Sequence, residues 1–255
     1  MSGHSHWSTI QRQKGANDAK RAKLFTKLSR EVSTAARDGG TNPDFNPRLR
    51  LAVQRARDAG VPNDNIERIL KRIAGGDDGS TLEEIWYEGY GTGGAAILVQ
   101  ALTDNRNRTS NEVRSTFSRQ GGNIGEVGSV SWIFDSTGTV VVEGSAGELE
   151  DVALSAIDAG AEDVGDPDGG QLEVYTTPSQ LETVRATLLE QGARVVQSEI
   201  SMRPKTRVDL EVSAAKQNLR LLERLDELDD VQQVYTNANF PSDVIDGVTD
   251  GQGRP

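Results

Sequence analysis

The chain has 255 residues with 28 Lys and Arg against 39 Asp and Glu, which gives a formal net charge of -11, and it contains no cysteine. The lack of cysteine excludes disulfides, thiolate nucleophiles and Cys-ligated zinc. No run of about 18 apolar residues occurs and no apolar stretch follows the first charges, so we expect neither a membrane span nor a secretory signal, and a cytoplasmic protein of two or three domains.

Charge is distributed unevenly along the chain. Residues 1–75 carry 15 Lys and Arg against 7 Asp and Glu, whereas residues 76–255 carry 13 against 32. This division indicates a basic module that meets a polyanion, joined to acidic modules that do not.

Three amphipathic helices are predicted in the basic module. The first covers about residues 18–37 and is stopped by two glycines. The second covers about residues 47–60, with Asn46 as its cap and a proline in its first position. The third covers about residues 63–74. Together they predict a small helical bundle.

The first helix divides into an apolar face and a cationic face on a helical wheel. Its apolar face consists of Leu24, Phe25, Leu28, Val32, Ala35 and Ala36. We expect the cations of this helix to contact nucleic acid. The glycine-containing arm before the helix is expected to be mobile and to add its own cations to the contact. Together these cations are Arg12, Lys14, Lys20, Arg21, Lys23, Lys27, Arg30 and Arg37. The alternative interpretation is an ordinary solvated face.

Strands and helices alternate from residue 80 onward. Residues 95–104 predict a buried strand, residues 109–121 a helix with Thr109 and Glu112 in capping-box register, and residues 128–135 a second strand. A complete βαββαβ series follows in residues 139–202. A further strand, helix and strand are then predicted at residues 206–212, 214–228 and 231–237.

The predicted fold class is α+β, with an N-terminal three-helix domain followed by two ferredoxin-like (βαββαβ) domains, one inserted in the other. This arrangement leaves the fewest sheet edges unpaired. The expected boundaries are residues 1–79 for the basic arm and helical domain, residues 80–136 with 204–240 for a discontinuous ferredoxin-like domain, residues 137–203 for the inserted domain, and residues 241–255 for a flexible tail.

Nothing in the sequence nominates a catalytic site or a cofactor. The glycine clusters at residues 89–94 and 121–129 lead into strands instead of opening helices, so turns are a better interpretation than phosphate loops. The two histidines, His4 and His6, lie in the arm, and no carboxylate is paired with a base or nucleophile in a motif. Removal of Met1 would place His4 third in the chain, where a Cu(II) or Ni(II) site can form, but such tripeptides arise by chance.

A polar segment follows the first predicted strand and opens the next helix. Its members are Asn105, Arg106, Asn107 and Arg108. One interpretation is turn chemistry with a helix cap, and the other is a second contact with phosphate in an otherwise acidic domain.

Several stretches together resemble the YebC family, whose mitochondrial relatives are translational activators of cytochrome c oxidase subunit I. They are GHSHW at 3–7, AKRAKLFTKLSREV at 19–32, AARDGG at 35–40, VPNDNIERIL at 61–70, YEGYGTGG at 87–94, LTDNRNRT at 102–109 and DDVQQVY at 229–235. The family usually has Lys in place of His6 and Pro in place of Thr92. The resemblance implies a non-enzymatic, three-domain protein that either regulates transcription on DNA or assists translation on the ribosome through proline-rich stretches.

Between these functions the charge pattern favours ribosomal RNA, because a long acidic remainder would repel a second stretch of nucleic-acid backbone. A DNA-binding transcriptional regulator is the alternative, although no helix-turn-helix spacing is evident. A protein-interaction adaptor is a third class. We expect no membrane association and no small-molecule substrate. The sequence does not fix the oligomeric state, and a monomer is favoured.

Overall fold

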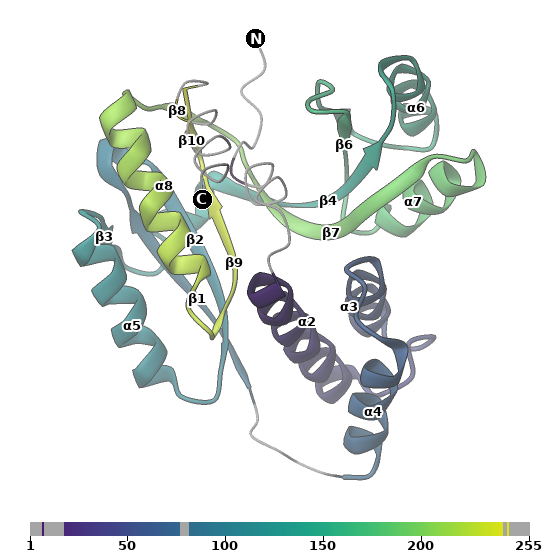
Figure 1. Cartoon of the computed structure of the whole chain (residues 1–255), viewed down its shortest axis with the longest axis horizontal. Helices are drawn as coiled ribbons and strands as arrows, with labels where there is room; N and C mark the ends of the chain where they lie inside the picture. The colour runs from purple at the N-terminus through teal and green to yellow at the C-terminus, as the bar shows by residue number, and fades with distance from the viewer. Residues whose placement is uncertain (1–6, 8–17, 77–81, 242–243, 245–255) are drawn as a thin grey trace.

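The computed structural model describes residue 7, residues 18–76, residues 82–241 and residue 244 of the chain. Its elements form a group of three helices and two antiparallel sheets, each covered by two helices (Figure 1). The predicted α+β class, with N-terminal helices followed by two such sheets, is confirmed.

The helical domain consists of α2 (Asp18–Gly39), α3 (Pro47–Asp58) and α4 (Asn63–Ala74), close to the predicted ranges. Asn46 caps α3, because its side-chain oxygen accepts the N–H of Leu49 at 3.0 Å. Its amide group donates to the carbonyls of Ala35 at 2.7 Å and Gly40 at 2.8 Å. One buried side chain therefore joins the end of α2 to the start of α3.

The core of this domain uses the predicted apolar face of α2. Its buried members are Leu28, Val32, Ala35, Ala36, Leu49, Ala52, Val53, Ala56, Val61 and Ile66, with Phe25 partly buried beside them. Leu24 is the exception, since it is 45% exposed.

The first sheet has the strand order β3-β1-β2-β9, and every neighbouring pair is antiparallel. Its strands are β1 (Glu83–Tyr90), β2 (Ala96–Thr103), β3 (Asn123–Ile124) and β9 (Val231–Thr236). Helices α5 (Arg106–Arg119) and α8 (Val212–Asp226) cover one face of it. We call this unit the outer domain.

Two of the strands predicted for the outer domain are wrong. Residues 128–135 hold a 3-10 turn, η2 (Ser131–Ile133), and only Phe134 and Asp135 are extended, as the start of β4 in the other sheet. Residues 206–212 contribute only β8 (Val208–Asp209), which pairs with β10 (Ala238–Asn239). The places of the two missing strands are taken by β1, which precedes the first predicted strand in the chain, and by β3.

The glycine cluster at residues 89–94 is a hairpin turn, as predicted. It contains a 3-10 turn, η1 (Thr92–Gly94), and joins β1 to β2, which pair from Tyr90 opposite Ala96. Gly93 has a φ of 79°, and a Cβ there would lie 2.9 Å from the Leu210 side chain. Glycine is therefore required at this position by both conformation and space.

The second sheet forms the inserted domain and follows the predicted βαββαβ order. Its elements are β4 (Phe134–Glu143), α6 (Ala146–Asp158), β5 (Asp163–Val164), β6 (Gln171–Thr176), α7 (Leu181–Glu190) and β7 (Arg194–Pro204). The strand order β5-β6-β4-β7 is that of a ferredoxin-like sheet, and α6 and α7 cover one of its faces (Figure 1).

Residues near both ends of the chain enter the core of the outer domain. Trp7 is 5% exposed and Val244 is 2% exposed, and both pack in the cluster formed by β1, β2, β9, α5 and α8. The expectations of a mobile arm and a flexible tail therefore do not hold at these two residues. Residues 1–6, 8–17, 242–243 and 245–255 lie outside the described structure.

Candidate nucleic-acid interface

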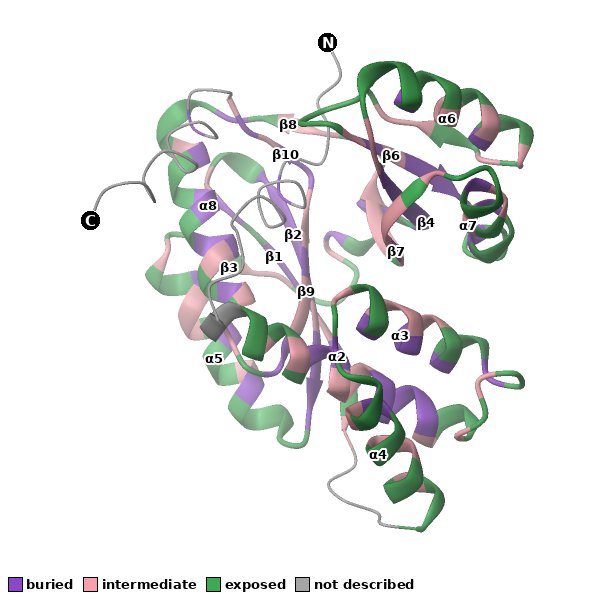
Figure 2. Ribbon diagram, turned by 45° about the vertical axis from the view of Figure 1, so that its right-hand side comes forward, coloured by how far each residue is buried: buried purple, intermediate pink, exposed green. Residues whose placement is uncertain are grey.

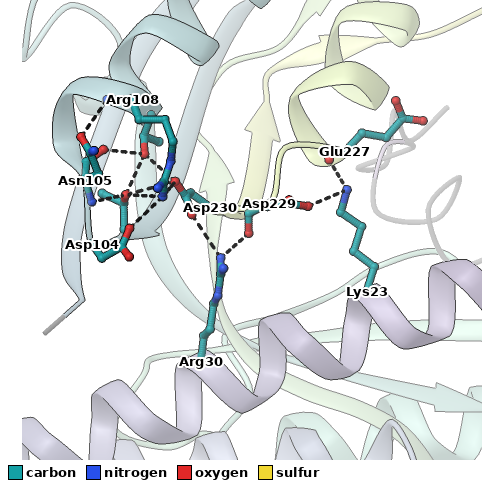
Figure 3. A network of polar contacts seen from close by, with 10 residues as sticks. Lys23, Arg30, Asp104, Asn105, Arg108, Glu227, Asp229 and Asp230 are labelled. Carbon is teal, nitrogen blue, oxygen red and sulfur yellow. Dashed lines mark hydrogen bonds and ion pairs between the residues drawn. The ribbon is translucent and has the colours of Figure 1, made fainter. Parts of the chain in front are cut away.

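The cations of α2 face the outer domain. Lys27 forms an ion pair with Asp226 at 2.8 Å and also donates to the Asp226 carbonyl at 2.9 Å. Lys23 donates to the carbonyl of Glu227 and lies 3.4 Å from the carboxylate of Asp229. Figure 3 shows the Lys23 side chain reaching the segment at the end of α8. We call this segment, residues 226–230, the acidic turn.

Arg30 continues the same contact one turn further along α2. Its guanidinium donates to the carbonyl of Asp229 and lies 3.3 Å from the carboxylate of Asp230. The carbonyls at the C-terminal end of α8 carry partial negative charge, so the α2 cations cap α8 as well as pairing with its acids. The predicted cationic face exists, but it is covered at these residues by acids about 200 positions away.

Asp230 is the centre of this network. Its carboxylate accepts hydrogen bonds from Arg108 at 2.7 Å, Thr109 at 2.7 Å and Thr103 at 3.1 Å, and its side chain is 5% exposed. Burial disfavours the charged form, but these hydrogen bonds together outweigh it and hold the pKa of Asp230 below its ordinary value. Arg108 of the polar segment after β2 and Arg30 of α2 therefore meet at the carboxylate of Asp230 (Figure 3).

The polar segment itself is a helix cap. Asn105 accepts the N–H of Arg108 at 3.1 Å and is the N-cap of α5, so the helix begins at Arg106, three residues before Thr109. The predicted capping box at Thr109 and Glu112 is wrong, because the Thr109 hydroxyl is buried and bonded to Asp230. Arg106 pairs with Glu83 at 3.3 Å, and Asn107 is exposed.

The remaining predicted contact residues are placed as follows. Arg21 lies over the ring of Phe25, 5.4 Å from its centroid. Arg37 is half-buried at the far end of α2 and lines the cleft described below. Lys20 lies in the first turn of α2, but its side chain, like Arg12, Lys14 and His4, lies outside the described structure.

A cleft of about 810 Å³ opens between α2, α4, the start of α5 and the acidic turn. Four arginines line it together with several carboxylates. They are Arg30, Arg37, Arg72 and Arg108, with Asp104, Glu112, Glu227, Asp229 and Asp230. The mixture of signs makes the cleft an electrostatically balanced surface, in which phosphate would meet both donors and acids.

A second set of cations lies on the outside of the helical domain, and sequence reasoning missed it. Its members are exposed and come from α3 and α4: Arg50, Arg57, Arg68 and Lys71. Figure 2 shows the exposed outer surface of these two helices. We call this set the α3–α4 cations.

The helical wheel that was applied to the first helix could have found them. On α4, Arg68 and Lys71 share one face, opposite the face of Ile66 and Ile73. Their contacts stay within the helical domain: Arg57 bonds to Asn63 at 3.1 Å, Arg68 to Asn65 at 3.2 Å, and Lys71 pairs with Glu67 at 3.3 Å.

Arg55 joins the helical domain to the inserted domain. Its guanidinium pairs with Glu31 of α2 at 2.7 Å and with Glu199 of β7 at 2.7 Å, and its side chain is 15% exposed. Burial disfavours the charged guanidinium, but the two carboxylates outweigh burial and raise the pKa of Arg55 above its ordinary value. Arg55 is therefore a buried structural cation.

The second glycine cluster, at residues 121–129, does not offer a phosphate loop. The carboxylate of Glu88 accepts the N–H groups of Gly128 at 2.7 Å, Val130 at 2.6 Å and Ser131 at 2.8 Å. Burial opposes the charge of Glu88, but these backbone bonds hold its pKa below its ordinary value. The backbone donors that an anion would need are thus already bound to the protein.

The described residues contain neither a metal-binding cluster nor a helix that could span a membrane. No group of three or more His, Cys, Asp or Glu side chains is placed there to hold a metal ion. None of the described helices combines the length and the apolar character that crossing a membrane requires.

Comparison with known proteins identifies the family. A model of the TACO1/YebC N-terminal domain matches residues 5–76, and a model of the TACO1/YebC second and third domain matches residues 82–238. The chain belongs to the TACO1/YebC family. The resemblance inferred from the seven sequence stretches is therefore confirmed.

Relatives match along nearly the whole chain. A probable transcriptional regulatory protein of Dehalococcoides mccartyi strain CBDB1 is 50% identical over 246 residues, covering 96% of this chain and 98% of the relative. A second protein of that description, from Chloroflexus aurantiacus, is 49% identical over 248 residues, covering 96% and 98%. A crystal structure of a conserved hypothetical protein from Aquifex aeolicus is 44% identical, with a TM-score of 0.81, and covers 88% of this chain and 93% of that chain. The Dehalococcoides and Chloroflexus relatives are named as regulatory proteins, not as enzymes.

Proposed function

We propose that this protein is a non-enzymatic, nucleic-acid-binding regulator of gene expression, and that its helical domain makes the contact. The observation that carries the proposal is the segregation of charge: the exposed α3–α4 cations lie on a basic domain, while the rest of the chain is strongly acidic. A surface of this kind attracts a phosphate backbone and restricts where it docks.

RNA of the ribosome is the partner we favour. Reading of duplex DNA usually needs a helix whose exposed face enters the major groove. The longest helix of the basic domain, α2, directs Lys23, Lys27 and Arg30 at the acidic turn instead. An acidic remainder also suits a partner that is locally negative but otherwise rich in protein. In this role the protein would assist translation through proline-rich stretches.

A DNA-binding transcriptional regulator is the second candidate. The Dehalococcoides and Chloroflexus relatives are named as probable transcriptional regulatory proteins, which favours it. The two candidates share the electrostatic contact and differ in the nucleic acid that supplies the phosphates.

Crosslinking in cells, followed by sequencing of the bound nucleic acid and by sedimentation of ribosomes, distinguishes the candidates. We expect ribosomal RNA among the crosslinked species and cosedimentation with ribosomes; enrichment of promoter DNA without cosedimentation would instead select the second candidate.

The contact surface is tested by reversing three α3–α4 cations, Arg57→Glu, Arg68→Glu and Lys71→Glu, in one variant. We expect this variant to lose crosslinking. A matched control reverses three exposed cations of the outer domain, Arg114→Glu, Lys216→Glu and Arg220→Glu, and should retain it. Equal losses in both variants would indicate a nonspecific effect of net charge and contradict the proposed surface.

A further inference from the structure

The acidic turn presents to α2 the chemistry that a phosphate backbone would present. Carboxylates and carbonyl oxygens follow one another along residues 226–230. Lys27 contacts Asp226, Lys23 contacts the carbonyl of Glu227 and the carboxylate of Asp229, and Arg30 contacts the carbonyl of Asp229 and the carboxylate of Asp230. Phosphate oxygens and carboxylate oxygens are the two ordinary partners of lysine and arginine donors. A donor that points at the acidic turn is therefore not available to a phosphate at the same time.

The acidic turn does not depend on α2 for its position. Asp230 is held from the other side by Arg108, Thr103 and Thr109, all of the outer domain. Hydrogen bonds join the backbone of the same segment to β2, since Leu102 donates to the Asp230 carbonyl at 2.8 Å. The turn should therefore keep its shape when the α2 cations change partner.

The contacts differ in how easily they can be exchanged. Asp229 has a side chain that is 86% exposed, and its Lys23 partner is 35% exposed, so this pair is open to solvent. Arg30 is 29% exposed and borders the cleft. Lys27, at 11%, is the least accessible. Rotation of the Lys23 side chain is enough to break its pair with Asp229, because ion pairs at exposed positions are weak. Arg30 can turn away without leaving Asp230 unpaired, because Arg108, Thr103 and Thr109 still bond to that carboxylate.

The domain as a whole need not move for this exchange. Arg55 pairs with Glu199, and Arg48 pairs with Glu84 at 2.5 Å, so the helical domain stays attached to both sheets. The cleft of about 810 Å³ beside Arg30 already opens next to the acidic turn. A phosphodiester segment in this cleft would lie within reach of the released Arg30 side chain.

We propose that the acidic turn is an intramolecular competitor for nucleic acid: it occupies the α2 cations in the free protein, and a phosphate backbone displaces it from Lys23 and Arg30. This inference rests on the proposed function, because it concerns the same basic domain. It adds a regulatory element to that function, since the acidic turn lowers the affinity for weakly bound polyanions.

The test measures binding of a fluorescently labelled single-stranded RNA of uniform sequence to the full chain. The variant Asp226→Asn with Asp229→Asn removes two competing charges but keeps the oxygen that accepts from Lys27. We expect it to bind roughly fivefold more tightly, because a phosphate no longer has to displace the carboxylates that pair with Lys23 and Lys27. We also expect the binding constant to fall more steeply with salt. The slope of its logarithm against the logarithm of salt concentration should steepen by about 0.7 for each added phosphate contact.

The matched control is Glu150→Gln with Asp151→Asn on α6, which removes the same charge from an exposed site of the inserted domain. Its affinity should stay at the wild-type value. An equal gain in the control, or no gain in the Asp226 and Asp229 variant with its thermal unfolding unchanged, would overturn the competition.

Failure of the proposed function gives a different pattern. If reversal of Arg57, Arg68 and Lys71 leaves RNA affinity unchanged while the Asp226 and Asp229 variant binds more tightly, the α3–α4 surface is wrong and the competition stands. If the reversal abolishes binding and the Asp226 and Asp229 variant matches wild type, the surface stands and the competition is overturned. If the chain binds no RNA and no DNA, both are overturned.

Discussion

The helical domain carries two sets of cations with opposite surroundings. Lys23, Lys27 and Arg30 of α2 lie against the acidic turn, whereas the α3–α4 cations face solvent. Both sets consist of lysine and arginine on the polar face of an amphipathic helix. The comparison shows that a cationic face identified from sequence can serve either as an interface between domains or as a surface for a partner, and that complementary acids elsewhere in the chain decide which.

The largest effect should come from the cation that pairs with two carboxylates of different domains. Arg55→Ala removes the partner of both Glu31 and Glu199, and leaving buried carboxylates unpaired costs about 3–5 kcal/mol. Arg57→Ala, two residues further along α3 and exposed, should change the free energy of unfolding by less than about 0.5 kcal/mol. Urea denaturation measures both, and similar losses would erase the distinction between covered and exposed cations.

Within the acidic turn, Asp230 should matter more than its neighbour. Asp230→Ala leaves Arg108, Thr103 and Thr109 without their shared acceptor, and we expect a loss of about 2–3 kcal/mol in the free energy of unfolding. Asp229→Ala, at an exposed side chain, should cost less than about 1 kcal/mol. Chemical denaturation of the two single variants is the measurement, and a reversed order would show that Asp230 is not the centre of the network.

The contribution of Asp230 should depend on pH in a defined direction. Because its pKa is lowered in the folded protein, its stabilising effect is fully present above the pKa of the unfolded chain, about 3.9, and is lost as the pH falls through the lower folded value. The stability gap between wild type and Asp230→Asn should therefore be constant near neutrality and narrow below about pH 4. A gap that widens on acidification would contradict the assigned direction.

The smallest effect should be that of single exposed cations on salt dependence. Arg68→Ala or Lys71→Ala should leave the unfolding free energy within about 0.5 kcal/mol of wild type. Each should reduce the log–log salt slope of RNA binding by about 0.7 if it contacts one phosphate of a single strand. Fluorescence anisotropy at several salt concentrations gives the slope, with Arg114→Ala of the outer domain as the variant that should not change it.

Local signals explain what could be predicted from sequence. Asn46 before Pro47 marked the start of α3, and the spacing of Leu28, Val32 and Ala35 marked the buried face of α2. The inserted domain was equally accessible, since each of its strands neighbours a turn and pairs within residues 134–204. In both regions the elements and their partners are close in the chain.

Long-range pairing explains what could not be predicted from the sequence. The strand β1 mixes Glu83, Glu84, Glu88 and Gly89 with apolar residues, and its buried carboxylate is compensated by a loop forty residues later. Likewise, no feature of the sequence near Lys27 indicates that Asp226 is its partner in an ion pair. The candidate site was therefore predicted in its residue types but not in its surroundings.

The pairing of Phe134 with Pro204 has a consequence for how the chain folds during synthesis. These two residues are the entry and exit of the inserted domain and lie opposite each other on β4 and β7. The outer sheet can close only when β9 reaches β2, with residues 104–230 between them. Once the inserted domain has folded, its ends are held together and the loop to be closed is effectively much shorter. We therefore expect the inserted domain to fold first as the chain emerges, and the outer sheet to close after its last strand has been made.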